Sequence, residues 1–438
     1  MKITVIGLGY LGATHAVAMA KIGHEVIGIE TSEEKLASLR SGKAGFYEPG
    51  LDEELAIQLA SGRLSFQSGH DQNSAASELH FICVGTPQRK DSLAANTSYL
   101  FSAIRDLAPY LNEKALVVGK STVPVGTAAE LTKELNSLVS FDAQLAWNPE
   151  FLREGTALED SLHPDRLVVG VDSEFTETKL SEVFAPMIQA GVPFIVTDIP
   201  TAELVKSAAN AFLATKISFI NSMAEIAEVS GANASMLAEA IGYDERIGNK
   251  FLRNGVGFGG GCLPKDIRSL MARAEELGVG ESVAYLKEVD KVNLRRRERV
   301  IELLKQELGS LSSRKVLVLG AAFKPDSDDI RDSPALDIAL LAKAAGAEVV
   351  IHDPISLPGV RAKHPELIAV DDLVAAFDSV DAVVLATEWK TYRELDPGLV
   401  KSVVSNALII DGRNVLDVAK WQSAGFKVLA LGRTIKEN

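Results

Sequence analysis

The sequence predicts an α/β protein with two parallel-sheet domains that are joined by a central helical domain. Three observations predict this fold. Short apolar or β-branched runs alternate with helical patterns at both ends of the chain, which is the pattern of βαβ units. Residues 201–230 read as one long helix, because they contain no Gly or Pro. The length of 438 residues suffices for about three domains.

The elements follow in chain order. Strands are expected at 3–6, 24–30, 79–85, 115–122, 143–147, 167–172 and 193–198, with a helix after the first strand to about residue 22. The long helix comes next, then a Gly-rich segment at 255–266 and a second helix at 281–308. Strands return at 315–320, 347–353, 381–387 and 407–412. The expected domains are therefore 1–199, 200–308 and 315–438, with a linker at 308–314.

Composition excludes several classes of function. The formal net charge is −14, which argues against sequence-independent binding to nucleic acid or to an anionic membrane. The chain has two cysteines, Cys83 and Cys262, and no Cys and His spacing typical of a metal site. Few cysteines and no apolar run of about 18 residues favour a protein of the reducing cytoplasm without a membrane span.

A dinucleotide site is predicted at the N-terminus. Residues 7–12 form a GxGxxG pattern between a strand and a helix, with Gly7 in the tight turn, Gly9 beside the pyrophosphate and Gly12 at the helix–strand contact. Glu30 ends the second strand, where a carboxylate binds the ribose hydroxyls and disfavours a 2′-phosphate. The pattern thus predicts a Rossmann-like domain that binds NAD rather than NADP, with a glycine turn without ligand as the less favoured interpretation.

Cys262 is the candidate nucleophile. It follows three glycines and precedes Pro264, which suits the start of a helix, so the thiolate would lie near a helix N-terminus. Lys265 and Asp266 place a cation and a base nearby. Cys83, in contrast, lies within a predicted strand and reads as a buried apolar residue.

Further polar residues are weaker candidates. Lys206 and Asn210 share a face of the long helix, but spacing alone favours a surface Lys and a capping Asn. Glu150 and Glu154 follow the strand at 143–147, at an edge where ligands bind, and Thr122 lies in a similar turn. Four arginines at 295–299 are expected to form a solvated, ion-paired helix face.

Together these residues resemble the nucleotide-sugar 6-dehydrogenases, the UDP-glucose/GDP-mannose dehydrogenase family, over essentially the whole chain. The likeness includes the glycine motif and VGTP (84–87), STVPVGT (121–127), NPEFLREG (148–155), KSAANAF (206–212), GFGGGCLPKD (257–266), FKPDSDDIRDSP (323–334) and DGRN (411–414). One departure is Gly261, where many members of the family carry Ser before the Cys.

The resemblance implies a double oxidation of a hexose C6 alcohol to a carboxylate, with NAD as oxidant. Cys262 would capture the intermediate aldehyde as a thiohemiacetal, and the second oxidation would give a thioester that water hydrolyses. Lys206 and Asn210 would stabilise oxyanions, Asp266 would act as base, and Thr122 would order a water. Glu150 and Glu154 would assist proton transfer and hydrolysis, although the sequence does not assign the base of each step.

The resemblance also implies binding residues. The expected cofactor-binding residues are Gly7, Gly9, Tyr10, Leu11, Gly12, Glu30, Lys35, Thr86, Thr122, Glu154, Cys262, Lys265 and Arg331. The expected substrate-binding residues are Phe151, Leu152, Glu154, Lys206, Asn210, Arg246, Phe251, Arg253, Gly257, Phe258, Cys262, Phe323, Lys324 and Arg413. Family members pack as dimers through the central helices, so a homodimer is expected, in which Arg246 reaches the neighbouring subunit's site.

The loop 246–252 looks like that of UDP-glucose enzymes, which implies oxidation of UDP-glucose to UDP-glucuronate. The main alternative is another substrate of the same class, GDP-mannose or a UDP-N-acetylhexosamine. A 3-hydroxyacid dehydrogenase would share the glycine motif and Lys-x-x-x-Asn, but Cys262 and residues 315–438 argue against it. A silent nucleotide-binding regulator is disfavoured by the presence of Cys262, Lys206, Asn210 and Asp266 together.

Overall fold

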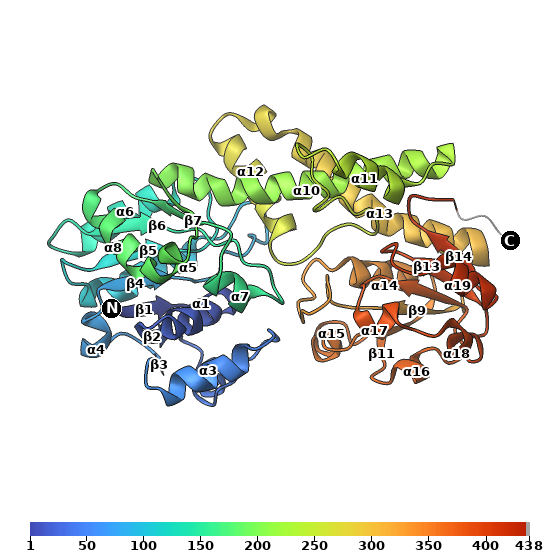
Figure 1. The fold of residues 1–438 in the computed structure, drawn as a ribbon, viewed down its shortest axis with the longest axis horizontal. Coiled ribbons are helices and arrows are strands. Elements are labelled where there is room, and N and C mark those ends of the chain that lie inside the picture. Colours follow the sequence, from blue (N-terminus) through green and yellow to red (C-terminus); the bar gives the residue numbers. More distant parts are fainter. Residues whose placement is uncertain (435–438) are drawn as a thin grey trace. The chain divides into compact units, whose positions relative to one another are not determined.

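The computed structural model describes residues 1–434 and divides the chain into two compact units. Unit 1 comprises residues 1–209 and 268–280, and unit 2 comprises residues 210–267 and 281–438. Each unit contains one β-sheet that is covered by helices (Figure 1). Two helices contribute residues to both units: α10 (Ile199–Ser230) and α12 (Leu263–Glu276).

Unit 1 is built on an eight-stranded sheet in the order β3-β2-β1-β4-β5-β6-β7-β8. Its strands are β1 (Lys2–Ile6), β2 (Glu25–Ile29), β3 (Leu64–Gln67), β4 (Leu79–Ile82), β5 (Leu116–Gly119), β6 (Gln144–Trp147), β7 (Leu167–Gly170) and β8 (Phe194–Thr197). Its helices include α1 (Tyr10–Lys21), α2 (Glu33–Arg40), α3 (Leu51–Ala60), α4 (Gln72–Ala75), α5 (Ser98–Leu107), α6 (Thr127–Leu138), α7 (Ala157–Leu162), α8 (Glu174–Val183) and α9 (Ala185–Gln189). Apolar cores lie on both faces of the sheet, because its central strands are buried along their whole length.

Unit 2 is built on a six-stranded parallel sheet in the order β11-β10-β9-β12-β13-β14. Its strands are β9 (Lys315–Leu319), β10 (Glu348–His352), β11 (Ile368–Ala369), β12 (Ala382–Leu385), β13 (Leu408–Asp411) and β14 (Lys427–Ala430). Its helices include α11 (Ala234–Gly242), α13 (Tyr285–Leu308), α14 (Pro334–Ala344), α15 (Leu357–Lys363), α16 (Leu373–Ala376), α17 (Lys390–Arg393), α18 (Pro397–Lys401) and α19 (Val418–Ser423). Two apolar clusters again cover the sheet.

The predicted fold class is confirmed, with two details that the sequence analysis lacked. First, β6 and β7 pair antiparallel through Trp147 and Gly170, so the sheet of unit 1 is not wholly parallel. Second, the strands β3, β11 and β14 were missed. Each lies at a sheet edge, is two to four residues long and has one or more residues that are not buried, so it lacks a continuous apolar run.

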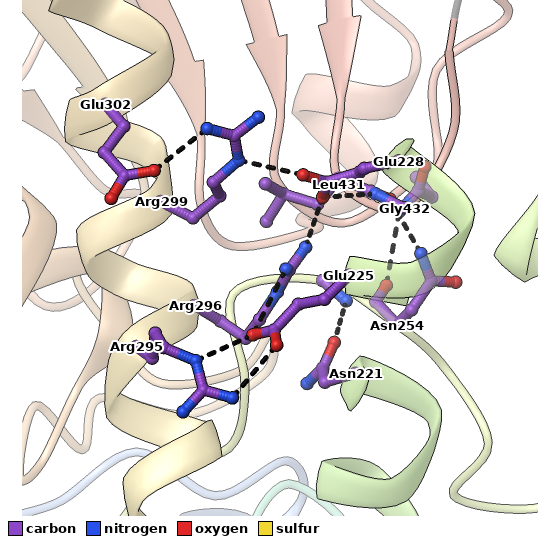
Figure 2. A network of polar contacts seen from close by, with 12 residues as sticks. Asn221, Glu225, Glu228, Asn254, Arg295, Arg296, Arg299, Glu302, Leu431 and Gly432 are labelled. Atoms are coloured by element: carbon purple, nitrogen blue, oxygen red, sulfur yellow. Dashed lines mark hydrogen bonds and ion pairs between the residues drawn. The ribbon is translucent and has the colours of Figure 1, made fainter. Parts of the chain in front are cut away.

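The arginine-rich face of α13 is ion-paired, as expected, but the prediction that it is solvated is wrong. The side chain of Arg296 is completely buried, and that of Arg297 is 2% exposed. Figure 2 shows the arginines of α13 directed toward Glu225 and Glu228 of α10. The Arg296 Nη2 atom lies 2.7 Å from Glu228 Oε1, and Arg299 Nε lies 2.8 Å from Glu228 Oε2. Arg295, Arg296 and Arg299 therefore fasten α13 to α10, and Arg295 remains partly exposed, whereas Arg297 pairs with Asp337 of α14.

Candidate functional site

The glycine motif of unit 1 forms a tight turn between β1 and α1. Gly7 has a positive φ of 86°, and a Cβ on Gly12 would lie 1.9 Å from the Gly7 carbonyl oxygen, so neither position accepts a side chain. A Cβ on Gly9 would meet no heavy atom within 4 Å, which leaves open space at the N-terminus of α1. The turn thus presents free backbone to an anionic ligand.

Glu30 lies at the wall of a cleft of about 660 Å³ that begins at this turn. Its carboxylate accepts hydrogen bonds from the backbone N–H groups of Leu8, Thr31 and Ser32, at 3.2, 2.9 and 3.0 Å. Lys35 Nζ lies 3.9 Å from Glu30 Oε2. The cleft is also lined by Gly7, Gly9, Ser68, His70, Val84, Tyr99 and Asp106. A fixed carboxylate beside open backbone fits the ribose and pyrophosphate of NAD.

The turn after β6 carries Glu150, whose carboxylate is held at both oxygens. Oε2 accepts a hydrogen bond from the Leu152 N–H at 2.6 Å, and Oε1 lies 3.1 Å from Lys206 Nζ on α10. Both side chains are largely buried, with 11% of Glu150 and 5% of Lys206 exposed. Phe151 packs beside them, with the Arg166 guanidinium 3.8 Å from its ring centroid. The structure therefore brings Lys206, Glu150, Phe151 and Leu152 together in unit 1.

Glu48, which the sequence analysis missed, fastens the end of the same turn. Its carboxylate accepts hydrogen bonds from the N–H groups of Gly155 and Ala157, each at 2.7 Å, and from the Tyr10 hydroxyl. Burial, together with the negative charges of Glu48 and Glu154, raises the pKa of Tyr10. The expected cofactor residues Tyr10 and Glu154 thus belong to one cluster. Thr86 and Thr122 form another contact, since the Thr86 hydroxyl donates to the Thr122 carbonyl at 2.7 Å.

Cys262 lies in unit 2, directly before the first residue of α12, as predicted. Four residues later Asp266, which is 1% exposed, accepts hydrogen bonds from Asn210 Nδ2 at 2.6 Å and Lys265 Nζ at 2.5 Å. Cys262 is exposed, whereas burial raises the pKa of the Cys83 thiol to about 12. Of the two thiols, Cys262 is therefore the one suited to react.

The glycine-rich segment before Cys262 is fixed by hydrogen bonds within unit 2. On one side, Asn293 of α13 exchanges two hydrogen bonds with the backbone of Phe258, at 2.7 and 3.0 Å. On the other side, the Gly261 N–H donates to Asp329 Oδ2 at 3.2 Å. A Cβ on Gly261 would lie 2.3 Å from Cζ of Arg331, so the absence of a side chain at Gly261 lets the Arg331 guanidinium pack against the residue before Cys262.

Arg331 and Asp329 form a pair beside this segment. Arg331 Nε donates to Asp329 Oδ1 at 2.8 Å, and Nη2 donates to Oδ2 at 2.8 Å. Burial alone raises the pKa of Asp329, but the hydrogen bonds and charge of Arg331 outweigh it and bring the pKa below its ordinary value. The pair therefore stays charged at neutral pH.

A pocket of about 700 Å³ lies in unit 2 and contains Phe251, Leu252, Arg253 and Arg413. Arg413 also donates to the carbonyls of Gly257 at 3.0 Å and Phe323 at 3.2 Å, which gathers five expected substrate residues. The pocket adds residues that the sequence analysis missed: Lys250, Asn254, Arg393 and Asn414. Four cationic side chains in one pocket suit a diphosphate.

Of the expected substrate residues, only Phe251, Arg253 and Arg413 line this pocket, and the others lie outside its lining. The side chain of Arg246 is 88% exposed and pairs with Asp244 at 2.6 Å. Lys324 lies with its Nζ 5.6 Å from the Phe323 ring centroid. Arg393 was missed although it follows β12, at the carboxyl edge where ligands bind, and that position was the signal that could have identified it. Within residues 1–434, no three His, Cys, Asp or Glu side chains gather as a metal site, and no helix is long and apolar enough to span a membrane.

Family models match most of the chain. Three models of the UDP-glucose/GDP-mannose dehydrogenase family match the chain: the NAD binding domain at residues 1–188, the central domain at 200–295 and the UDP binding domain at 317–418. The UDP-glucose 6-dehydrogenase of Rhizobium meliloti is 39% identical over 437 residues, covering 99% of this chain and 100% of that protein. UDP-glucose 6-dehydrogenase TuaD of Bacillus subtilis is 38% identical, with 99% and 93% covered.

Solved structures of nucleotide-sugar dehydrogenases also match the chain over nearly its full length. A UDP-glucose dehydrogenase from Pyrobaculum islandicum has a TM-score of 0.91 and 37% identity, with 99% of this chain and 98% of that chain covered. A UDP-D-ManNAc dehydrogenase from Pyrococcus horikoshii has a TM-score of 0.86 and 28% identity, with 99% of each chain covered. The chain therefore belongs to the UDP-glucose/GDP-mannose dehydrogenase family and is an NAD-dependent oxidoreductase.

Proposed function

We propose that the chain oxidises UDP-glucose to UDP-glucuronate in two NAD-dependent steps that are linked by a covalent bond to Cys262. The observation that carries this proposal is the exposed Cys262 thiol at the start of α12, with the buried Asp266 carboxylate one helical turn later. The residues that line the cleft beside Glu30 would hold NAD, which would supply the hydride acceptor for each oxidation.

The thiol accounts for the second oxidation. In the first oxidation the C6 alcohol loses a hydride and a proton and becomes an aldehyde. The Cys262 Sγ atom then adds to C6, and the new C–S bond gives a thiohemiacetal. Loss of a second hydride converts it into a thioester. Water adds to the thioester carbonyl, the C–S bond breaks, and the carboxylate and the Cys262 thiolate are released.

The remaining residues stabilise charge and move protons. Lys206 and Asn210, one turn apart on α10, stabilise the oxyanion on the C6 oxygen. Asp266 accepts the proton from the thiol or water, and Asn210 and Lys265 hold its carboxylate in place. Thr122 orders the water, while Glu150 and Glu154 on the turn after β6 assist proton transfer and hydrolysis. In the pocket of unit 2, Arg253 and Arg413 meet the diphosphate and Phe251 contacts the nucleotide sugar.

The NADH yield per sugar tests the covalent route. We expect two NADH per UDP-glucose consumed at saturating NAD, and a kcat for Cys262→Ser that is lower by several orders of magnitude. Brief treatment of the native protein with iodoacetamide should label Cys262 and spare Cys83, because only Cys262 is exposed.

One NADH per sugar, with Cys262→Ser as active as wild type, would contradict the covalent route and favour a single oxidation. A much higher kcat/KM for GDP-mannose or a UDP-N-acetylhexosamine would move the assignment to that substrate within the same family. One of the similar structures named above is a UDP-D-ManNAc dehydrogenase at 28% identity, so a UDP-N-acetylhexosamine should be assayed beside UDP-glucose.

We further propose that the protein acts as a cytoplasmic homodimer that pairs through α10. Phe212, Phe219 and Ile226 recur every seven residues on this helix and are 67%, 49% and 57% exposed, and Val229 is 87% exposed. Such a continuous apolar stripe on one helix face fits a second copy of the same helix. The free, exposed thiol of Cys262 suits a reducing compartment.

A further inference from the structure

The three glycines before Cys262 lie against the stretch 323–334, which follows β9 in unit 2. A Cβ on Gly259 would lie 2.3 Å from a backbone carbonyl oxygen of this stretch. A Cβ on Gly260, which has a positive φ of 84°, would lie 2.9 Å from the ring of Phe323. The backbone before the thiol therefore meets this stretch directly, and the contacts that the stretch offers decide where the backbone lies.

Two consecutive backbone N–H groups before the thiol are held by the same stretch. The Gly260 N–H donates to the Arg331 carbonyl at 2.9 Å. The Gly261 N–H donates to Asp329 Oδ2 at 3.2 Å. Because both N–H groups already have acceptors, they are suited to fix the chain and not to bind an oxyanion. Gly261 directly precedes Cys262, so the Asp329 carboxylate is hydrogen-bonded to the residue next to the nucleophile.

The Asp329 carboxylate is itself held at both oxygens. Oδ1 accepts hydrogen bonds from the backbone N–H and from Nε of Arg331, at 2.9 and 2.8 Å, and Oδ2 accepts one from Nη2 at 2.8 Å. The backbone N–H of Asp329 donates to the Ser327 hydroxyl at 3.0 Å. The Asp329 side chain is 10% exposed, and it lines neither the cleft beside Glu30 nor the pocket of unit 2. Asp329 is thus a fixed acceptor that has no place in either ligand cleft.

This arrangement suits the placement of a nucleophile better than its activation by charge. Arg331 balances the charge of Asp329, and its side chain is 57% exposed, so water screens what remains. The pair instead fixes the direction of the chain at Gly261. A thiol adds to a carbonyl carbon when the two atoms are held about 3–3.5 Å apart, and an error of about 1 Å can lower the rate roughly 100-fold. The position of the residue before Cys262 therefore matters for the covalent step.

We propose that Asp329 is a positioning residue for Cys262. By holding the Gly261 N–H, it sets where the Cys262 Sγ atom lies when the C6 aldehyde forms, so that the C–S bond forms before the aldehyde dissociates. Asp329 itself exchanges no proton and no electron in this step. The inference rests on the proposed function, because it needs the covalent role of Cys262.

The test removes the carboxylate in Asp329→Ala and follows both oxidations. We expect kcat for UDP-glucose to fall about 10-fold, because Sγ is no longer held in place. The NADH formed per sugar consumed should fall well below two, because part of the aldehyde leaves before Cys262 captures it. Borodeuteride added to the protein-free filtrate should convert this aldehyde into UDP-glucose that carries one deuterium, which mass spectrometry detects. The KM for UDP-glucose should change less than about 2-fold, because Asp329 lines neither ligand cleft.

Two further variants separate position from stability. Asp329→Asn keeps the size of the side chain and one acceptor oxygen, so its losses should lie between those of wild type and Asp329→Ala, and it provides the same test if Asp329→Ala does not fold. Asp326→Asn changes an exposed carboxylate of the same stretch at a positive φ of 58°, which Asn tolerates, and it should behave as wild type. Two NADH per sugar in both Asp329 variants overturns the proposal, even where kcat falls with the folded fraction.

The contact can also be measured without turnover, by hydrogen exchange resolved at single residues. In wild type the Gly261 amide should exchange at least about 10-fold more slowly than in an unstructured chain. Asp329→Ala should remove this protection and leave that of the Phe258 amide, which donates to Asn293, unchanged. An unprotected Gly261 amide in wild type overturns the proposal. A wild type that reduces no NAD with any nucleotide sugar contradicts the proposed function instead, and the exchange at Gly261 still decides whether Asp329 holds the segment.

Discussion

Glu48 shows how one buried carboxylate can order an active-site turn. Three backbone N–H groups at residues 155, 157 and 158 donate to it, at 2.7, 2.7 and 3.4 Å, and 6% of the residue is exposed. The Tyr10 hydroxyl donates to it as well. Glu48 therefore connects the glycine motif with the turn of Glu150 and Glu154, although more than a hundred residues separate the two segments.

Replacing Glu48 by Gln should weaken this connection. The amide keeps the size of the side chain but turns one acceptor oxygen into a donor that faces N–H groups, so hydrogen bonds to a charged acceptor are lost. We expect the free energy of unfolding to fall by about 2 kcal/mol and kcat to fall several-fold. Urea unfolding and steady-state kinetics measure the two effects.

Glu53→Gln is the matched control, since Glu53 is exposed in the first turn of α3. Stability equal to wild type in Glu48→Gln would show that the four contacts contribute little. If Glu48→Gln is less stable than wild type but has the same kcat, Glu48 contributes to folding stability and not to catalysis.

Sequence alone predicts residues that stand in a motif and misses those that serve it. Cys262 was predicted from its local pattern, whereas Lys206 and Glu150 were predicted from the family resemblance, and the roles of all three stay predictions. Glu48 was missed because nothing near it in the sequence indicates its partners. Those partners are set by tertiary packing, which brings distant segments of the chain together.

At the scale of elements, α10 and α13 are joined by a network of charges rather than by apolar side chains alone. Glu228 of α10 receives Arg296 and Arg299 of α13 and the N–H of Gly432, which follows β14 (Figure 2). Burial by itself raises the pKa of Glu228, but the hydrogen bond and charge of Arg296, with Gly432 and Arg299, outweigh it and lower the pKa. The ionised carboxylate of Glu228 therefore stabilises the folded state.

This network predicts a pH dependence of stability. A lowered pKa in the folded state means that the contribution of Glu228 is complete above about pH 5 and is lost as the pH falls through the folded-state pKa. Glu228→Gln should therefore cost about 3 kcal/mol at pH 7 and less at pH 3.5, where the carboxylate has begun to lose its contribution. Denaturant unfolding at both pH values tests this.

Glu302→Gln is the control for this experiment, because Glu302 is 62% exposed and pairs with Arg299 at 2.9 Å at the surface. Its cost should stay below about 1 kcal/mol at either pH. If Glu228→Gln lowers the free energy of unfolding by the same amount at both pH values, the Glu228 side chain stabilises the fold by its shape and not by its charge.

The elements themselves were largely predictable. After a first Lys, the central strands β1 and β9 are buried runs of mostly apolar residues, and α10 contains no Gly and no Pro beyond Pro200 in its first turn. Arg296 and Arg297 were assigned to the wrong environment because charge on a helix usually faces water. Their burial follows from carboxylates and carbonyls on other elements, such as Glu228 and the Phe258 carbonyl, which no pattern on α13 reveals.

At the scale of the whole molecule, the proposed homodimer accounts for large apolar side chains that the single folded chain leaves exposed. The stripe of Phe212, Phe219, Ile226 and Val229 exposes large apolar side chains on a helix that is otherwise well packed. Phe219→Glu should convert the protein to a monomer at micromolar concentration, as measured by size-exclusion chromatography with light scattering, because a charge in an apolar interface is strongly unfavourable.

Phe175→Glu on α8 is the control, since Phe175 is 38% exposed and lies outside α10, so this variant should keep the wild-type mass. A monomeric wild type would refute the dimer. A dimer that is unaffected by Phe219→Glu and by a second change, Phe212→Glu, would refute pairing through α10.

The division of the chain into three domains at 1–199, 200–308 and 315–438 stays a prediction, and the structure offers a different partition for experiments that cut the gene. Unit 1 holds Lys206 and unit 2 holds Asn210, so the boundary falls within one turn of α10, and residues 268–280 return to unit 1. Neither unit is a continuous stretch of sequence. A chimera that exchanges one unit for that of another family member needs three junctions, after residues 209, 267 and 280. A single crossover at the end of the glycine-motif domain would leave part of α12 with the wrong parent, and libraries built by recombination should be designed around that constraint.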